Sequence, residues 1–262
     1  MPRFCANIST MFTELPLPDR FQAAAGAGFE AVEIQLPYDF DCALLAERAR
    51  QAAVEVVLIN MPCGNPREGD RGIACLPSRV DEFRRGIGVA REYARALGCR
   101  MLNCLGGIAP AGEDEALLRR TFIENLRQAT RELPESKVLI EPQNTRTFPN
   151  VFLRHTAQAL SLIDEVQAPN LALQYDFFHM QVMEGDLAMT LERHLARIGH
   201  VQFADVPGRH EPGTGEINFA YLFDRIDRLG YRGWVGAEYT PAACTEEGLG
   251  WASAYLRRGR TP

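Results

Sequence analysis

The stretch VLIEPQN, residues 138–144, has the pattern of a buried β-strand that ends in an acid. Three branched apolar residues lead directly into Glu141, and Pro142, which cannot continue a central strand, follows it. A buried carboxylate costs several kcal/mol unless a cation, a hydrogen-bond network or a proton compensates it. The rest of the chain should therefore supply a partner for Glu141.

Apolar runs of this kind recur along the chain. Near-continuous apolar runs are typical of parallel strands that are buried on both faces of a sheet. The strand candidates are residues 4–8, 31–35, 55–60, 101–105, 137–141, 171–176, 200–205 and 234–239.

The segments between these runs carry apolar residues at helical spacing. In the clearest of them, Val80, Phe83 and Ile87 begin an apolar stripe, Ser78 is expected to cap the helix, and Gly98 is expected to end it. The other predicted helices cover residues 19–27, 43–53, 118–133, 156–166, 187–198, 219–229 and 246–256.

Eight strands alternating with eight helices in 262 residues predict an α/β fold, a (β/α)8 TIM barrel, as a single domain over residues 1–262. The alternative is an open doubly wound sheet. Such a sheet would more naturally carry a glycine-rich loop after its first strand, where this chain reads STMFTELPLP. The longest irregular segment, residues 61–77, is expected to be a lid, a substrate contact or a solvated loop.

Composition and charge exclude several classes of protein. A net charge of -6 argues against a broad nucleic-acid-binding surface, and no apolar run approaches the length of about 18 residues needed for a membrane span. The N-terminus shows no signal peptide, and seven cysteines without a CxxC pair indicate reduced, mostly buried thiols. These features predict a cytoplasmic protein. The oligomeric state stays open, a homo-oligomer included.

Polar side chains end four consecutive predicted strands. In α/β barrels the active site lies at the C-terminal ends of the strands, so these side chains should converge. Carboxylates placed so close together either hold protons or share a cation, and ligands that offer only oxygen favour Mg²⁺ or Mn²⁺ over Zn²⁺. A single acid at such a position is often just a helix cap, but four residues together favour a metal site. They are Glu141, Asp176, Gln202 and Glu238.

Four further residues are candidates for substrate binding. His179 follows Asp176 by three residues and could donate a hydrogen bond to a substrate oxygen, the alternative being a packed histidine. Arg209 and Arg71 are candidate partners for a substrate carboxylate, the alternative being solvated loop residues. Asp205 is predicted to orient Gln202 or a substrate rather than to touch the metal.

These motifs together resemble the hydroxypyruvate isomerase family of the xylose-isomerase-like barrel superfamily. The resemblance runs from FCANIS through IEPQN and QYDFFHMQ to WVGAEY, residues 4–239, and its most specific run is GRHEPGTGEIN, residues 208–218. It implies a (β/α)8 barrel that interconverts hydroxypyruvate and tartronate semialdehyde. It also places the metal ligands on the four strand-end residues and the two catalytic residues on Glu141 and Glu238. Many relatives in the superfamily have His at the position of Gln202, and an amide there again favours Mg²⁺ or Mn²⁺.

The residues support the same chemistry. Isomerising an α-hydroxy carbonyl compound moves a proton between adjacent carbons, and Glu141 and Glu238 can take and return it. The substrate would be a small hydroxy or oxo acid. The alternatives are a 2-oxo-tetronate isomerase and a ketose 3-epimerase, whose relatives usually carry His in place of Gln202. A non-catalytic binding protein and an endonuclease-like DNA repair protein belong to other classes. The repair proteins use several zinc ions and many histidines, and this chain has five histidines.

Overall fold

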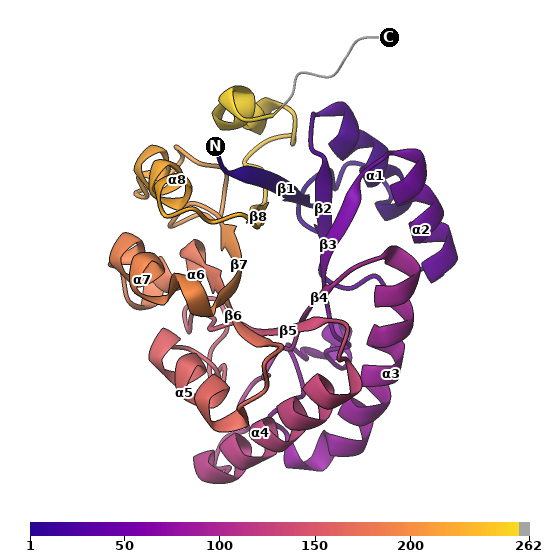
Figure 1. The fold of residues 1–262 in the computed structure, drawn as a ribbon, viewed down its shortest axis with the longest axis vertical. Coiled ribbons are helices and arrows are strands. Elements are labelled where there is room, and N and C mark those ends of the chain that lie inside the picture. The colour runs from indigo at the N-terminus through magenta and orange to yellow at the C-terminus, as the bar shows by residue number, and fades with distance from the viewer. Residues whose placement is uncertain (257–262) are drawn as a thin grey trace.

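Eight parallel strands close into a barrel in the computed structural model, which describes residues 1–256 (Figure 1). Each strand pairs with its neighbours in the sequence, and β8 pairs with β1. The predicted TIM barrel is confirmed, the open sheet is excluded, and every predicted strand lies within two residues of its observed bounds. The strands are β1 Arg3–Asn7, β2 Ala31–Ile34, β3 Glu55–Asn60, β4 Met101–Asn103, β5 Lys137–Ile140, β6 Leu171–Asp176, β7 Ile198–Phe203 and β8 Trp234–Ala237.

Helices surround the barrel as an outer layer (Figure 1). The α-helices are α1 Leu17–Gly26, α2 Cys42–Gln51, α3 Val80–Leu97, α4 Glu115–Glu132, α5 Thr156–Val166, α6 Phe177–Met183, α7 Leu187–His194 and α8 Phe219–Arg228. Four 3-10 helices complete the elements of residues 1–256: η1 Pro66–Glu68, η2 Pro77–Arg79, η3 Leu195–Arg197 and η4 Glu247–Ala254. Residues 257–262, the end of the predicted single domain, lie outside the described residues.

Two predictions about helices are wrong. The predicted α-helix at 246–256 is the 3-10 helix η4, in which Gly248 and Gly250 lower the helix propensity. Its Trp251 ring packs edge-on against Phe4, with 5.2 Å between the ring centroids. The segment therefore still covers the barrel where the helix after β8 was expected, beside β1 and α8 (Figure 1).

The start of α3 also differs from the prediction. Pro77 opens the 3-10 turn η2, so α3 begins only at Val80, and the Ser78 side chain does not cap it. The C-terminus is as predicted, because Gly98 adopts a left-handed conformation with φ of 66°.

The long segment 61–77 is ordered by contacts with its surroundings. Gly72 forms an antiparallel bridge with Gly106, which follows β4. Asp70 accepts a hydrogen bond from the Arg79 guanidinium at 2.6 Å. The segment therefore lies fixed against the loop after β4.

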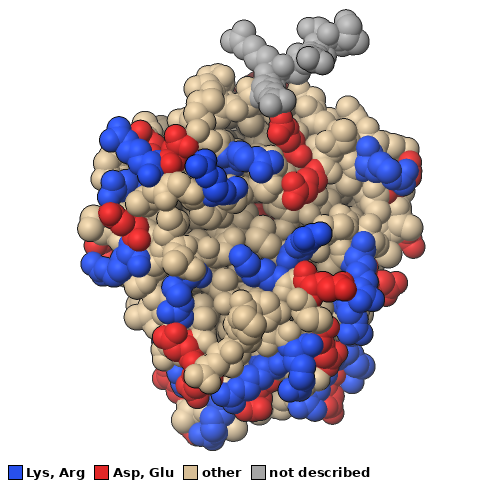
Figure 2. Space-filling model, viewed as in Figure 1, with Lys and Arg blue, Asp and Glu red and all other residues tan. Residues whose placement is uncertain are grey.

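Two general properties bear on the predicted class of protein. All seven cysteines are free and five of them are buried, which confirms the prediction of unpaired, mostly buried thiols. Within residues 1–256, no helix is both long enough and apolar enough to cross a membrane. On the face seen in Figure 2, Lys and Arg side chains lie interspersed with those of Asp and Glu.

Candidate active site at the barrel mouth

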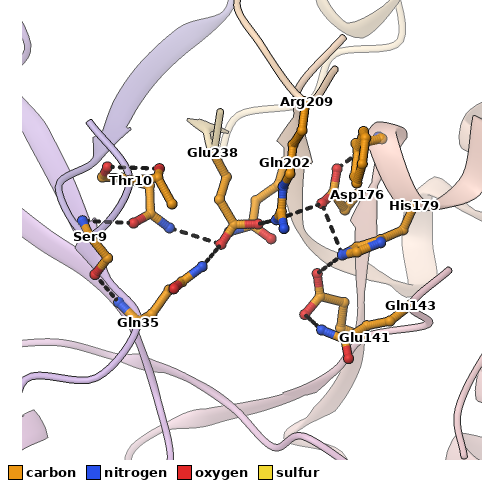
Figure 3. Close-up of polar contacts among 12 residues, drawn as sticks. Ser9, Thr10, Gln35, Glu141, Gln143, Asp176, His179, Gln202, Arg209 and Glu238 are labelled. Carbon is orange, nitrogen blue, oxygen red and sulfur yellow. Dashed lines mark hydrogen bonds and ion pairs between the residues drawn. The ribbon is translucent and has the colours of Figure 1, made fainter. Parts of the chain in front are cut away.

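Three buried carboxylates lie at the C-terminal ends of the strands, here called the mouth (Figure 3). Asp176 ends β6, and Glu141 and Glu238 directly follow β5 and β8; each is 5% exposed or less. Burial raises the pKa of all three carboxyl groups, and the charge of Glu238 raises the pKa of the other two further. The pKa of Asp176 rises to about 7. The predicted convergence of these acids is therefore present.

Glu141 is held through one of its two oxygens. The side-chain amide of Asn103 donates to Oε2 at 2.9 Å, and Gln143 donates to the same oxygen at 3.5 Å. The other oxygen, Oε1, is buried and has no hydrogen-bond partner. This strand end therefore presents one free carboxylate oxygen.

Glu238 is held through both oxygens. Asn7 and Gln35 donate their amides to Oε1 at 2.9 and 2.8 Å, and Arg209 donates to Oε2 at 2.7 Å (Figure 3). Side chains from β1, the end of β2 and the loop after β7 thus meet on this one carboxylate.

Asp176 combines the two roles that a strand-end acid can have. Its Oδ1 accepts the backbone N–H of Phe178 at 2.8 Å and so caps α6. Its Oδ2 is buried without a hydrogen-bond partner and lies 3.9 Å from Arg209. Capping therefore uses one oxygen and leaves the other for the site.

His179 lies in the mouth with a defined tautomer. Its Nδ1 accepts the backbone N–H of Asn144 at 3.1 Å, so in the neutral ring Nε2 carries the proton. Burial, with a smaller contribution from Arg209, lowers the pKa of His179 well below its ordinary value and keeps the ring neutral. The Nε2–H, which has no hydrogen-bond partner, lies 3.7 Å from Asp176 and 3.9 Å from Glu141. It is a donor ready for an oxygen atom of a ligand.

Arg209 brings a positive charge among these acids. Burial disfavours its charged form, but Glu238, Asp176 and Glu141 outweigh this effect and raise the pKa of its guanidinium. The guanidinium also lies 5.0 Å from the Phe178 ring centroid. The Arg209 backbone has φ of 57°, a left-handed conformation that costs a non-glycine residue about 1–2 kcal/mol. Local backbone strain is therefore tolerated in order to place this side chain.

Gln202 lies between the mouth and a polar layer deeper in the barrel. Its Oε1 accepts from Gln174 at 2.5 Å, and its Nε2 donates to Glu33 at 3.2 Å. Glu33 also bonds to the ring of His200 at 2.9 Å, and all four side chains are at most 1% exposed.

Asp205 is buried and is held by the backbone of its own loop. Its two oxygens accept four backbone N–H groups, from Val206, Gly213, Gly215 and Ile217, at 2.8–3.1 Å. Asp205 thereby orders the loop that carries Arg209.

Arg71 lies on the ordered segment 61–77, half-exposed. Its guanidinium donates to the backbone oxygens of Asp70 and Pro66 at 2.7 and 3.3 Å. The structure thus shows it bound to its own loop.

The strand-end pattern does not reveal the polar residues that support the acids, which are Asn7, Glu33, Gln35, Asn103, Gln174 and His200. A signal was available. Alternate residues of a strand share a face, so Glu33 and Gln35 fall on one side of the predicted strand 31–35. Glu33, a charged residue inside an otherwise apolar strand, would have indicated that this face of the strand contributes to a polar site.

The residues of the mouth fit a divalent cation. Two buried anionic oxygens without a donor, Glu141 Oε1 and Asp176 Oδ2, point to a common cation or ligand. Ligand atoms of Glu141, Asp176 and His179 lie within 4.8 Å of one another. Because His179 Nε2 carries a proton, His179 is suited to donate a hydrogen bond, whereas the two carboxylate oxygens are suited to a cation.

Comparison with known proteins identifies the family. Residues 21–255 match the family model described as xylose isomerase-like TIM barrel. The chain belongs to the xylose isomerase-like TIM barrel family. Within it, the chain is 47% identical to hydroxypyruvate isomerase of Escherichia coli (strain K12), covering 97% of this chain and 100% of that protein. It is 43% identical to 2-oxo-tetronate isomerase of Pectobacterium atrosepticum, covering 98% and 99%.

These relatives confirm the predicted resemblance to the hydroxypyruvate isomerase family and place the chain among isomerase enzymes. A crystal structure from Brucella melitensis, described as an AP endonuclease of family 2, has a TM-score of 0.96 and 46% identity to this chain. The match covers 98% of this chain and 100% of that one.

Proposed function

We propose that this isomerase interconverts hydroxypyruvate and tartronate semialdehyde (2-hydroxy-3-oxopropanoate) through an enediolate, with a divalent metal ion. The observation that carries the proposal is the pair Glu141 and Glu238. Both are buried at the mouth, and each is anchored by side-chain amides through one oxygen. The relative named hydroxypyruvate isomerase in Escherichia coli, which matches over its full length, supports the choice of substrate.

The proposed ligands of the metal ion are Glu141, Asp176, Gln202 and Glu238, and the proposed ion is Mg²⁺ or Mn²⁺. All four side chains offer oxygen, the ligand atom that these hard cations prefer. When bound, such an ion would acidify the C–H group next to the substrate carbonyl and stabilise the negative charge that develops.

The protein's own groups would carry the proton. One of the two glutamates removes it from the carbon that bears the hydroxyl group, the other delivers a proton to the neighbouring carbon, and the hydroxyl proton passes to the former carbonyl oxygen. His179 Nε2–H, held neutral and aimed into the mouth, donates a hydrogen bond to a substrate oxygen. Burial of these groups excludes water, which would otherwise weaken each of these interactions.

The carboxylate of the substrate needs a cationic partner, and Arg209 is the first candidate. Its guanidinium is already in the mouth, and its planar shape can bind a carboxylate through two parallel hydrogen bonds. Arg71 on the segment 61–77 is the second candidate and would have to leave its present backbone partners.

A 2-oxo-tetronate is the second candidate substrate. Two relatives of 43% and 46% identity, from Pectobacterium atrosepticum and Cupriavidus necator, are named 2-oxo-tetronate isomerase. The same residues would serve this four-carbon acid.

A nuclease role has less support, although one similar structure is described as an AP endonuclease. Of the five histidines, all within residues 1–256, His179 is the one that contacts the acids of the mouth.

The test is a turnover and proton-exchange assay on the purified protein. Hydroxypyruvate and 2-oxo-tetronates are supplied separately in D₂O with Mg²⁺, with Mn²⁺ or with EDTA, and deuterium incorporation is followed by NMR. We expect turnover and exchange with hydroxypyruvate, loss of both in EDTA and recovery on addition of metal. Turnover that survives EDTA treatment would remove the metal from the proposal. Turnover of tetronates alone would transfer the proposal to the second substrate.

A further inference from the structure

The polar layer beneath the mouth contains a buried acid that the proposed reaction does not use. Glu33 lies in the middle of β2 and is 0% exposed. Its Oε2 accepts from Gln202 Nε2 at 3.2 Å and bonds to His200 Nε2 at 2.9 Å, while its Oε1 has no hydrogen-bond partner. Apolar residues of similar volume are often more stable in such a place than a buried acid and its partner. This arrangement therefore calls for a function.

A glycine on the facing strand makes room for this acid. At Gly236 of β8, an added Cβ would lie 2.0 Å from Glu33 Oε1 and 2.9 Å from Gln202 Cγ. Any other residue at position 236 would displace both side chains. Strand β8 is thus shaped around the contact between Glu33 and Gln202.

The contact decides which way the amide of Gln202 points. A side-chain amide can be turned by 180°, which exchanges its oxygen and its NH₂ group. Gln174, the second partner of Gln202, is itself an amide that can turn in the same way, so it cannot select an orientation. An ionised carboxylate only accepts hydrogen bonds, so Glu33 holds the NH₂ group of Gln202 toward itself.

The oxygen of Gln202 is then directed to the other side. There it accepts a hydrogen bond from Gln174 Nε2 at 2.5 Å, on β6, the strand that ends in Asp176, and its second lone pair remains for a cation. We propose that Glu33, paired with His200, is a positioning residue that presents the amide oxygen of Gln202 to the divalent cation of the mouth. This inference rests on the proposed role of Gln202 as a metal ligand.

The test measures Mn²⁺ binding to metal-free protein by calorimetry, so that its readout does not depend on turnover. The variants are Glu33→Gln, Gln202→Ala and the double variant, each checked for a cooperative thermal transition by circular dichroism. Glu33→Gln keeps the volume but can present either end of its amide to Gln202. We expect it to raise the Kd for Mn²⁺ about ten- to a hundredfold, as is typical when a residue that orients a ligand is lost. In the Gln202→Ala background the same change should alter the Kd by less than about twofold, because Glu33 acts through Gln202.

Three outcomes would overturn the inference, and they differ in what they leave standing. If Gln202→Ala weakens Mn²⁺ binding but Glu33→Gln does not, the positioning role fails and the proposed ligand set survives. If Glu33→Gln weakens binding equally in both backgrounds, Glu33 supports the barrel without acting on Gln202. If Gln202→Ala binds Mn²⁺ like the unaltered protein, both the inference and the ligand role of Gln202 fail.

A second pair of variants keeps the test available if Glu33→Gln does not fold. Gln at position 200 offers an Nε2 donor at about the reach of the imidazole Nε2, whereas Leu offers none. His200→Gln should therefore retain Mn²⁺ affinity, and His200→Leu should lose about tenfold or more. Equal Mn²⁺ affinities of the two folded variants would contradict the proposed pairing.

Discussion

Glu141 and Glu238 occupy equivalent positions, each directly after a barrel strand and each 5% exposed, yet their surroundings differ. Both oxygens of Glu238 accept hydrogen bonds, and one of the donors is the charged Arg209. Glu141 has one close donor, Asn103, and a free oxygen. The Glu238 side of the mouth is therefore saturated with donors, and the Glu141 side is not.

The difference has an electrostatic consequence. Burial raises the pKa of both carboxyl groups. For Glu141 the charges of Glu238 and Asp176 add to this effect, and its pKa rises well above the ordinary value. For Glu238 the guanidinium of Arg209 opposes burial. The carboxyl groups of two glutamates at equivalent strand ends thus differ in the charges that act on their pKa, because residues on other elements surround them differently.

The largest expected effect is the loss of either carboxylate. We expect Glu141→Gln and Glu238→Gln each to lower kcat by about 10²–10⁴-fold, the usual contribution of a general acid or base. The amide keeps the volume of the side chain, so the melting temperature by circular dichroism should stay close to that of the unaltered protein. A variant that keeps more than about a tenth of the original kcat would lose its assigned role.

The next effect comes from the charge that distinguishes the two sides. Arg209→Ala should raise KM for hydroxypyruvate about ten- to a hundredfold, because hydrogen bonds between charged groups contribute about 1.5–3 kcal/mol. Arg209→Lys keeps the charge without the planar pair of donors, so its KM should fall between that of the unaltered protein and that of Arg209→Ala. Steady-state kinetics separate KM from kcat. An unchanged KM in Arg209→Ala would exclude this residue as the partner of the substrate carboxylate.

A matched pair of variants tests whether the number of hydrogen-bond donors to each glutamate affects activity. Asn103 is the one close donor to Glu141, whereas Asn7 shares its acceptor oxygen on Glu238 with Gln35. Asn103→Ala should lower kcat/KM about tenfold, and Asn7→Ala less than about threefold, because a second donor remains on Glu238. Equal losses in the two variants would show that the number of donors does not set the sensitivity of each side.

The sequence predicted the strand ends better than the residues that support them. Glu141, Asp176 and Glu238 could be found because each ends an apolar run, and a closed barrel brings such ends together. The register between strands was not available from the sequence. It decides that Asn103 meets Glu141 and that Glu33 meets Gln202, so these contacts required the structure.

Loops limited the prediction in a similar way. Arg209 was one of several charged loop residues, and its entry into the mouth depends on its left-handed backbone and on the four N–H groups that Asp205 gathers. Neither follows from local periodicity. The helix at 246–256 was misjudged because its apolar pattern outweighed Gly248 and Gly250 in the prediction.

The smallest expected effect concerns Arg71, on the segment 61–77. Its neighbour Gly72 bridges to Gly106 after β4, the strand whose Asn103 holds Glu141. Because Arg71 is half-exposed and would have to leave its backbone partners, a contact with the substrate should contribute at most about 1 kcal/mol.

Arg71→Ala should therefore raise KM about two- to fivefold with kcat unchanged, the range that corresponds to an exposed charge pair. Arg67→Ala, on the same segment with an 89% exposed side chain, is the matched control and should leave KM unchanged. A KM equal to that of the unaltered protein would remove Arg71 from the substrate site. A rise as large as that of Arg209→Ala would instead make Arg71 the main partner of the substrate carboxylate.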